Sequence, residues 1–375
     1  MKHVSFNRPK FGHLTKMAVA ASALMLQSSL AIAQEAQFAP LAEQFGPLNA
    51  QTGDRHTPQR VLPIPQTASE AAQALIAAPY SPYWNLAPTS DEEWIATVAA
   101  SSEYGVQEAT ALREAHGITI EDATLGGVPV FILRPETVPE AHQNQVLINL
   151  HGGGYVFGPG RSGTSEATVM ADIGGYEVIA VDYRMPPEAP FPAAVEDALA
   201  VYRDVLETHD PANVGIFGTS AGGGLTLSLV HKIKSEGLPV PGAIAPISPW
   251  SDLTETGDSY RTNEWIDNVL VSYDGYLGRA AALYADGHDL SDPLLSPING
   301  DFDGFPPTTL TAGTRDLFLS NTARVHRGLR QEGIAAELHI FEGLSHAQHI
   351  FDWSMPETRE LYREITAFFD VHLSD

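Results

Sequence analysis

A serine between two glycines is the residue best placed to do chemistry in this sequence. Ser220 lies at the centre of the segment 218–222, which reads GTSAG and joins an apolar run to a helical pattern. A serine at the tip of such a strand–turn–helix unit is held in a strained conformation, and side chains at the glycine positions would collide with neighbouring backbone. The pattern predicts an accessible nucleophile at a helix N-terminus, where free N–H groups favour developing negative charge.

A serine hydroxyl becomes a nucleophile only with a base in hydrogen-bond reach and a carboxylate that orients this base. Asp316 follows the apolar run 308–312, and His346 follows the run 338–341. Both therefore lie after the carboxyl end of a predicted strand, in the order serine, aspartate, histidine that this type of sheet requires. We predict Ser220 as nucleophile, His346 as general acid and base, and Asp316 as its orienting carboxylate.

Three other residues remain open as alternatives. His349 would lie one turn beyond His346 if this segment is helical, and it could serve as the base. Asp292 or Glu342 could replace the acid, although the sequence Ser-Asp-Pro around Asp292 is more typical of a capped turn. A metal site at the two histidines has no third ligand nearby, and we expect neither a metal nor another cofactor.

A glycine-rich stretch supplies a second element of the chemistry. His151 and three glycines follow directly after the apolar run 146–150. Glycines there would let backbone N–H groups approach a carbonyl oxygen that becomes negative in a tetrahedral intermediate, together with the amide of Ala221. A phosphate-binding loop is the alternative, but the stretch lacks a following Lys-Ser/Thr and does not fit the pattern Gly-x-Gly-x-x-Gly with an acidic residue downstream.

The elements that must position these residues alternate in type. Apolar runs typical of strands occupy residues 118–120, 128–133, 146–150, 178–181, 214–217, 243–245, 308–312 and 338–341. Helical patterns lie between most of them, and Gly126-Gly127 predicts a hairpin turn. This alternation predicts an α/β fold with a mostly parallel central sheet that is flanked by helices.

Two segments depart from this alternation. Residues 68–115 have a helical pattern with Ser90 as an N-cap and with candidate anchors at Trp84, Trp94, Ile95 and Val98. Residues 251–303 form a long, acidic and aromatic insertion. We expect both segments to contribute to a helical cap.

Composition limits the class of protein. A chain of 375 residues with 43% hydrophobic residues can bury a large core, and it fits one large domain with a cap better than two domains. Its 46 acidic and 21 basic residues give a formal net charge of −25, which argues against nucleic acid or an anionic membrane as a partner. With no cysteine, disulfides and thiolate chemistry are excluded.

Four motifs together resemble the hormone-sensitive-lipase-like (bacterial family IV) esterases of the α/β-hydrolase fold. They read HGGG at 151–154, DYRMPPE with FPAA at 182–194, GTSAGG at 218–223 and GLSH at 343–346, and the resemblance extends from Ile118 to the C-terminus. It implies that Gly153 and Gly154 supply the oxyanion hole, with Gly152 as a shaping residue. It also implies a helical cap over an acyl pocket and a serine carboxylesterase that hydrolyses short- to medium-chain carboxylic esters.

Two departures from the common family pattern leave the substrate subclass open. Thr219 stands where many relatives have aspartate, and Asp316 is not followed by proline. A lactone hydrolase, or another acyl hydrolase on the same scaffold, is therefore the alternative function. Tyr155 and Trp250 are the predicted substrate-binding residues, with packing in the core as the alternative.

Asp182 and Arg184 lie beyond a predicted strand and outside the triad. We expect them to form a salt bridge that holds a structural turn.

The N-terminus has the pattern of an export signal. An apolar run at 17–26 follows several basic residues and precedes the small-residue sequence Ala31-Ile32-Ala33. We predict a signal peptide at 1–33, a leader and N-terminal cap helices at 34–115, and a catalytic domain at 116–375 with a cap insertion at about 251–303. The mature protein is expected in the periplasm or outside the cell, acting on a small-molecule ester or lactone without a stable membrane anchor; an amphipathic N-terminal anchor and a homodimer stay open.

Overall fold

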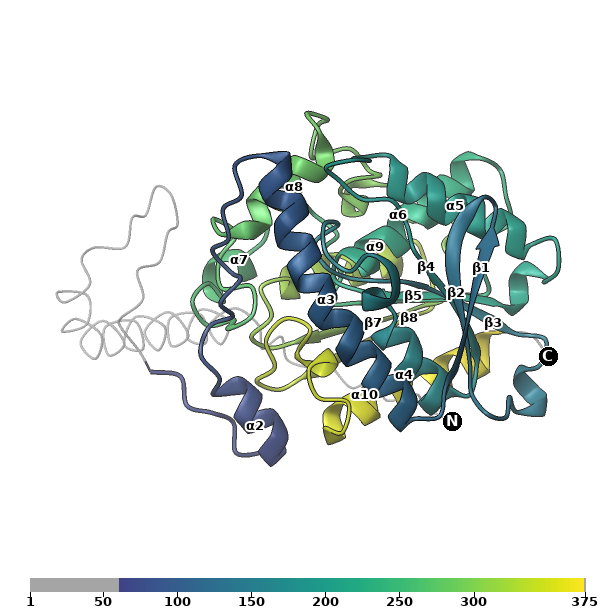
Figure 1. Cartoon of the computed structure of the whole chain (residues 1–375), viewed down its shortest axis with the longest axis horizontal. Coiled ribbons are helices and arrows are strands. Elements are labelled where there is room, and N and C mark those ends of the chain that lie inside the picture. Colours follow the sequence, from purple (N-terminus) through teal and green to yellow (C-terminus); the bar gives the residue numbers. More distant parts are fainter. Residues whose placement is uncertain (1–60, 374–375) are drawn as a thin grey trace, which may run out of the picture. The chain divides into compact units, whose positions relative to one another are not determined.

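An eight-stranded sheet forms the centre of the part of the chain that the computed structural model describes, residues 61–373. Its strands lie in the order β1-β2-β4-β3-β5-β6-β7-β8 (Figure 1). The pairs β1–β2 and β2–β4 are antiparallel, and the remaining pairs are parallel. The predicted mostly parallel sheet is thus confirmed.

Each predicted strand is present, with ends that differ by a few residues at most, except that the first extends further toward the hairpin. The strands are β1 (Thr119–Leu125), β2 (Val128–Arg134), β3 (Val146–Leu150), β4 (Glu177–Val181), β5 (Val214–Thr219), β6 (Ala243–Ile247), β7 (Thr308–Gly313) and β8 (Ala336–Phe341). Gly126 and Gly127 form the turn between β1 and β2, and both have positive φ, which glycine adopts without strain.

Helices fill most of the connections between strands. The α-helices are α2 (Glu70–Ile76), α3 (Asp91–Ala115), α4 (Ser165–Gly174), α5 (Ala193–Val205), α6 (Ala221–Ser235), α7 (Ser259–Thr262), α8 (Tyr276–Ala285), α9 (Leu319–Gln331) and α10 (Pro356–His372). Short 3₁₀ helices are η1 (Glu140–His142), η2 (Gly160–Gly163), η3 (Pro211–Asn213), η4 (Pro297–Asn299) and η5 (Gln348–Ile350).

The sheet is covered on both faces, as its apolar strands require. Helices α5, α6 and α9 pack on one face, and α4 and α10 pack on the other (Figure 1). Side chains of a strand alternate between the two faces, so Ile148 joins the core under α5 and α6 while its neighbour Leu147 joins the core under α4 and α10. The loops that contain the predicted triad and oxyanion-hole residues follow the carboxyl ends of β3, β5, β7 and β8.

The helical pattern before the sheet resolves into α2 and α3, with an irregular connection between them. Ser90 caps α3 as predicted, because its hydroxyl accepts a hydrogen bond from the amide of Glu93 at 3.3 Å. Trp94 is a buried anchor, but Ile95 is exposed and Trp84 lies in the connection, where its ring meets Trp265 edge-on. Ile95 is therefore not an anchor, because α3 buries only part of one face, and Trp84 is half-buried but lies outside the helix.

The segment 251–303 contains α7, α8 and η4, joined by irregular backbone. Tyr284 is fully buried in the core, whereas Trp265 is half exposed. No helix among residues 61–373 is both long and apolar enough to cross a bilayer. The predicted signal peptide, its cleavage after Ala33 and the leader at 34–60 lie outside the described residues.

Candidate active site

Ser220 occupies the sharp turn between β5 and α6. Its backbone has φ 62° and ψ −120°, a strained conformation for a residue with a side chain. A Cβ atom at Gly218 would lie 2.1 Å from the carbonyl oxygen of Leu150, and one at Gly222 would lie 1.8 Å from the same oxygen. The glycines on both sides of the serine are therefore required by the close approach of β3, as the sequence pattern predicts.

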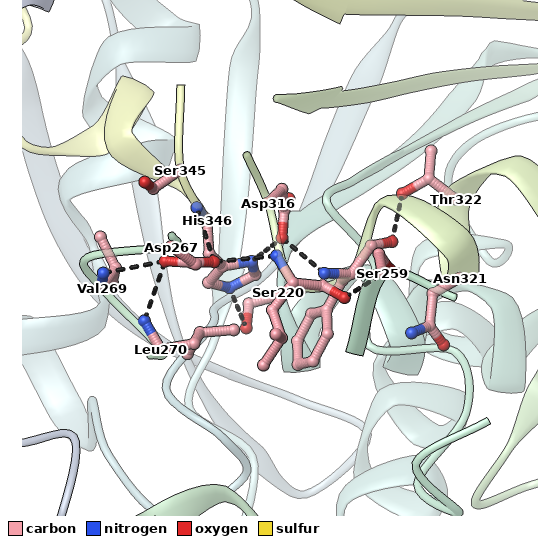
Figure 2. A network of polar contacts seen from close by, with 12 residues as sticks. Ser220, Ser259, Asp267, Val269, Leu270, Asp316, Asn321, Thr322, Ser345 and His346 are labelled. Carbon is pink, nitrogen blue, oxygen red and sulfur yellow. Dashed lines mark hydrogen bonds and ion pairs between the residues drawn. The ribbon is translucent and has the colours of Figure 1, made fainter. Parts of the chain in front are cut away.

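The side chains of Ser220, His346 and Asp316 lie in one hydrogen-bonded row (Figure 2). The Nε2 atom of His346 is 2.9 Å from the Ser220 hydroxyl, and its Nδ1 atom is 3.0 Å from Oδ1 of Asp316. The same Asp316 oxygen accepts a hydrogen bond from the amide of Phe318 at 2.7 Å, which fixes the carboxylate. An imidazole held in this way can take a proton from the serine while the carboxylate stabilises the resulting positive charge.

The alternative residues do not enter this row. His349 is buried and lies 3.3 Å from the hydroxyl of Thr219; burial lowers the pKa of its imidazole to about 3. The carboxylate of Asp292 accepts a hydrogen bond from the amide of Leu294, as a turn cap does, and Glu342 is exposed. Residues 61–373 contain no group of acidic and histidine side chains that could hold a metal ion.

Three backbone amides, of Gly153, Gly154 and Ala221, are the candidate donors to a substrate oxygen. Gly153 and Gly154 have φ of 114° and 64°, and a Cβ atom at Gly153 would lie 2.3 Å from the carbonyl oxygen of Phe157. Ala221 is the first residue of α6, so its amide has no acceptor within the helix. Within the described part of the chain, no hydrogen bond occupies the amides of these three residues. They are free to donate to a bound oxygen atom.

A cavity of about 550 Å³ opens over Ser220 and His346. Its walls come from α3, the segment 151–166, the insertion 251–303 and the segment after His346. The side chains they contribute include Ser101, Tyr104, Glu108, Val269, Leu270, Tyr276, Ile350, Phe351 and Trp353. The apolar and aromatic members gather in the insertion and in the segment after His346, where they suit the hydrocarbon part of a small molecule, while residues 151–166 add polar groups such as Ser162, Ser165 and Glu166.

The predicted substrate-binding residues do not belong to this wall. Tyr155 and Trp250 are fully buried, and their rings stack on Tyr284 and Phe318 at centroid distances of 3.9 and 5.6 Å. A Cβ atom at Gly224 would lie 2.8 Å from the Tyr155 hydroxyl, which shows how closely the ring packs on α6. Neither side chain lines the cavity, so their predicted place in the acyl pocket is wrong.

The predicted ion pair between Asp182 and Arg184 is also wrong. Arg184 makes a bidentate contact with Asp197 of α5, with Nη2–Oδ1 and Nε–Oδ2 distances of 2.7 and 2.9 Å. The Asp182 carboxylate accepts a hydrogen bond from the amide of Gly160 at 2.7 Å instead. Both residues hold turns, as expected, but through partners that only the folding of α5 and η2 brings close.

Two buried carboxylates beside the site carry no sequence motif. Glu166 of α4 lines the cavity and accepts hydrogen bonds from Thr219 Oγ1 at 2.6 Å and Asn149 Nδ2 at 3.3 Å. Burial raises the pKa of its carboxyl group. The second is Asp267, which contacts the loops of both Asp316 and His346. Neither residue has a local sequence signal, since Glu166 lies between Ser165 and Ala167 and Asp267 between Ile266 and Asn268.

Comparison with known proteins agrees with this fold and site. Residues 147–350 match the family model of the alpha/beta hydrolase fold. An acetyl-hydrolase of Streptomyces hygroscopicus is 34% identical over 231 residues, which are 61% of this chain and 77% of that protein. The crystal structure of esterase E25 has a TM-score of 0.82 and 38% identity, and covers 86% of this chain and 99% of its own. An esterase of the bacterial hormone-sensitive lipase family has a TM-score of 0.65 and 28% identity, over 76% and 100% of the two chains.

The nucleophile elbow, the parallel sheet and these matches define the class as a serine hydrolase on an α/β sheet. The chain belongs to the α/β-hydrolase family, in the group similar to hormone-sensitive lipase, which confirms the resemblance seen in its motifs. It is a carboxylic ester hydrolase, and its relatives favour an ester over the lactone alternative.

Proposed function

We propose that Ser220, His346 and Asp316 hydrolyse a carboxylic ester in two steps. The Ser220 oxygen attacks the ester carbonyl while Nε2 of His346 takes the hydroxyl proton. The same imidazole then gives this proton to the departing alcohol, which leaves an acyl group on the serine. A water molecule repeats the sequence, releases the carboxylic acid and restores the hydroxyl. The observation that carries the proposal is the continuous row of 2.9 and 3.0 Å contacts from serine to aspartate.

The amides of Gly153, Gly154 and Ala221 are the proposed oxyanion hole. Negative charge develops on the carbonyl oxygen as the tetrahedral intermediate forms, and preorganised N–H donors stabilise it more than they stabilise the substrate. Positive φ at both glycines and the start of α6 at Ala221 support this role. Gly152 is the proposed shaping residue, since a Cβ atom there would lie 2.8 Å from the carbonyl oxygen of Thr219.

A fluorophosphonate probe tests the proposed nucleophile directly, because it phosphonylates an activated serine. We expect the wild-type protein to be labelled, with peptide mapping by mass spectrometry placing the adduct on Ser220. The variant His346→Ala should lose labelling while remaining folded by circular dichroism. An adduct on another serine, or undiminished labelling of His346→Ala, would count against the assignment.

The substrate class that best suits the cavity is a short- to medium-chain ester. Helix α3 and the insertion 251–303 are the proposed cap, because residues of both line the cavity of about 550 Å³ above Ser220. A series of p-nitrophenyl esters from acetate to palmitate tests this size limit. We expect kcat/KM to be highest for short and medium chains and to fall for long ones; an optimum at palmitate would contradict it.

Export to the periplasm or the medium is a further part of the proposal. Basic residues, the apolar run 17–26 and Ala31-Ile32-Ala33 support cleavage after Ala33. The net charge of −25 supports a protein without nucleic acid or an anionic membrane as partner. Mass spectrometry of the exported protein would give the mature N-terminus, and a mature form that retains Met1 would refute cleavage. The mass of the protein in solution would show whether it forms a homodimer.

A further inference from the structure

Asp267 is a fully buried carboxylate that the triad chemistry does not use. It lies between α7 and α8 and accepts four backbone hydrogen bonds (Figure 2). Its Oδ1 atom accepts from the amides of Val269 at 2.8 Å and Leu270 at 3.1 Å. Its Oδ2 atom accepts from the amides of Leu317 at 2.8 Å and His346 at 3.2 Å.

These four contacts join three parts of the active site. Leu317 directly follows Asp316, and the fourth amide belongs to His346 itself, so one carboxylate oxygen connects the loops of the acid and of the base. The other oxygen holds Val269 and Leu270, which line the cavity. A change at Asp267 would therefore alter both the Asp316–His346 spacing and the wall beside the substrate.

Two further side chains of the same segment hold the acid loop. Asn263 donates from Nδ2 to the carbonyl oxygen of Asp316 at 2.8 Å. The Ser259 hydroxyl donates to the carbonyl oxygen of Leu317 at 2.7 Å. Ser259, Asn263 and Asp267 are spaced four residues apart, and the backbone between them follows i→i+4 hydrogen bonds, so all three face the same loop. The insertion is thus fastened to the acid loop at repeated points.

The charge of Asp267 matters as well as its shape. All four of its backbone partners are donors, so an ionised carboxylate fits, whereas an amide would direct an N–H group at other N–H groups. Burial and the nearby Asp316 raise the pKa of the Asp267 carboxyl above its usual range, and His346 opposes this shift. Burial raises the pKa of Tyr276 to about 12, and the charge of Asp267 adds to this shift; burial lowers the pKa of His349, and the charge of His346 adds to that lowering. A negative charge at Asp267 favours the imidazolium that forms during each step.

We propose that Asp267 is a positioning residue for ester hydrolysis, which holds the Asp316 loop, the His346 loop and the cavity wall in one arrangement. The proposal rests on the catalytic roles proposed above for Asp316 and His346. Asp267 does not contact the reacting atoms, so its effect is on the geometry and charge of the triad and not on a bond that forms or breaks.

The variant Asp267→Asn tests the proposal, with Asp252→Asn as the matched control. Asp252 is a carboxylate of the same insertion and is equally buried, but its partners are Thr254 and Arg324. Both variants keep the side-chain volume and remove one buried charge. We expect Asp267→Asn to lower kcat for p-nitrophenyl butyrate about 100-fold, as for a catalytic group displaced by ~1 Å, with KM changed by less than about threefold. We expect Asp252→Asn to keep kcat within about threefold of the wild type even if it unfolds at a lower temperature.

The pH profile of kcat/KM distinguishes a positioning role of Asp267 from a purely structural one. Loss of the negative charge beside His346 should shift the acid limb of kcat/KM to lower pH in Asp267→Asn, and Asp252→Asn should keep the wild-type profile. Equal kcat and equal pH profiles for the two variants would overturn the positioning role. A wild-type protein that is inactive, or a Ser220→Ala protein that is fully active, would instead refute the proposed function.

Hydrogen exchange of the wild-type protein tests the same point if Asp267→Asn does not fold. The amides of Val269, Leu270, Leu317 and His346 share one acceptor group. Their protection factors should fall together as the pH is lowered and the Asp267 carboxyl, whose pKa is raised by burial, takes up a proton. Protection that is lost in one loop and kept in the other would contradict the proposal.

Discussion

Replacing Gly222 by alanine would place a methyl group 1.8 Å from the carbonyl oxygen of Leu150 and 2.7 Å from that of His151. Ordinary contact between such atoms needs a separation larger by roughly 1.5 Å, so the end of β3 has to move away from the elbow. Overpacking of this kind costs about 1–3 kcal/mol in the free energy of unfolding. Because His151 leads into Gly153 and Gly154, the same movement displaces two proposed oxyanion donors. A displacement of ~1 Å is expected to reduce kcat about 100-fold.

Steady-state hydrolysis of p-nitrophenyl butyrate and urea unfolding of the same preparation measure the two effects. Gly127→Ala is the control: no atom lies within 4 Å of its added Cβ, and only its φ of +83° opposes the substitution. We expect this control to lose about 1 kcal/mol of stability to backbone strain and to keep its kcat. A Gly222→Ala protein with kcat within about twofold of the wild type would refute the argument that this glycine maintains the oxyanion geometry.

The remaining predictions concern stability. Burial lowers the pKa of His349 to about 3 and that of His231 to about 4, so both are neutral in the folded protein while the unfolded chain takes up protons below the ordinary histidine pKa. The free energy of unfolding should therefore fall as the pH decreases below about 6.5, by roughly 2 kcal/mol per group at about pH 5; urea melts at the two pH values measure it, and equal stability at both would contradict the assignment. Arg184→Ala removes the bidentate partner of the buried Asp197 carboxylate. We expect it to lower the free energy of unfolding by only about 1–2 kcal/mol, because solvent screens the largely exposed arginine. Arg184→Lys should restore only part of this loss, and an Arg184→Ala protein as stable as the wild type would show that the pair contributes nothing.

The sheet could be predicted from the sequence because its signals are local. A parallel strand buried on both faces is a short apolar run, as in Val146–Leu150, which the structure reproduces residue for residue. The three residues of the proposed triad could be selected because each follows such a run at the carboxyl end of a strand. Gly218 and Gly222 also marked the position of the nucleophile in the sequence, because a Cβ atom at either glycine would meet the carbonyl oxygen of Leu150 at the end of β3.

The remaining parts of the site depend on contacts between distant segments, and the sequence does not encode these in any short pattern. Tyr155 and Trp250 lie beside motif residues, yet the packing of α6 and α8 turns their rings into the core. Arg184 pairs with Asp197 only because the chain after β4 turns so that the start of α5 lies beside this arginine. Asp267 is invisible as a site residue until the insertion meets the loops after β7 and β8.

The most direct test of the central claim is the activity of the Ser220→Ala protein against p-nitrophenyl butyrate. Removal of the hydroxyl leaves the strained turn, the imidazole and the free amides in place but takes away the atom that attacks the ester. The account predicts a loss of about 10⁶-fold in kcat, with the folded state unchanged by circular dichroism. A Ser220→Ala protein that hydrolyses the ester at a rate near that of the wild type would contradict it.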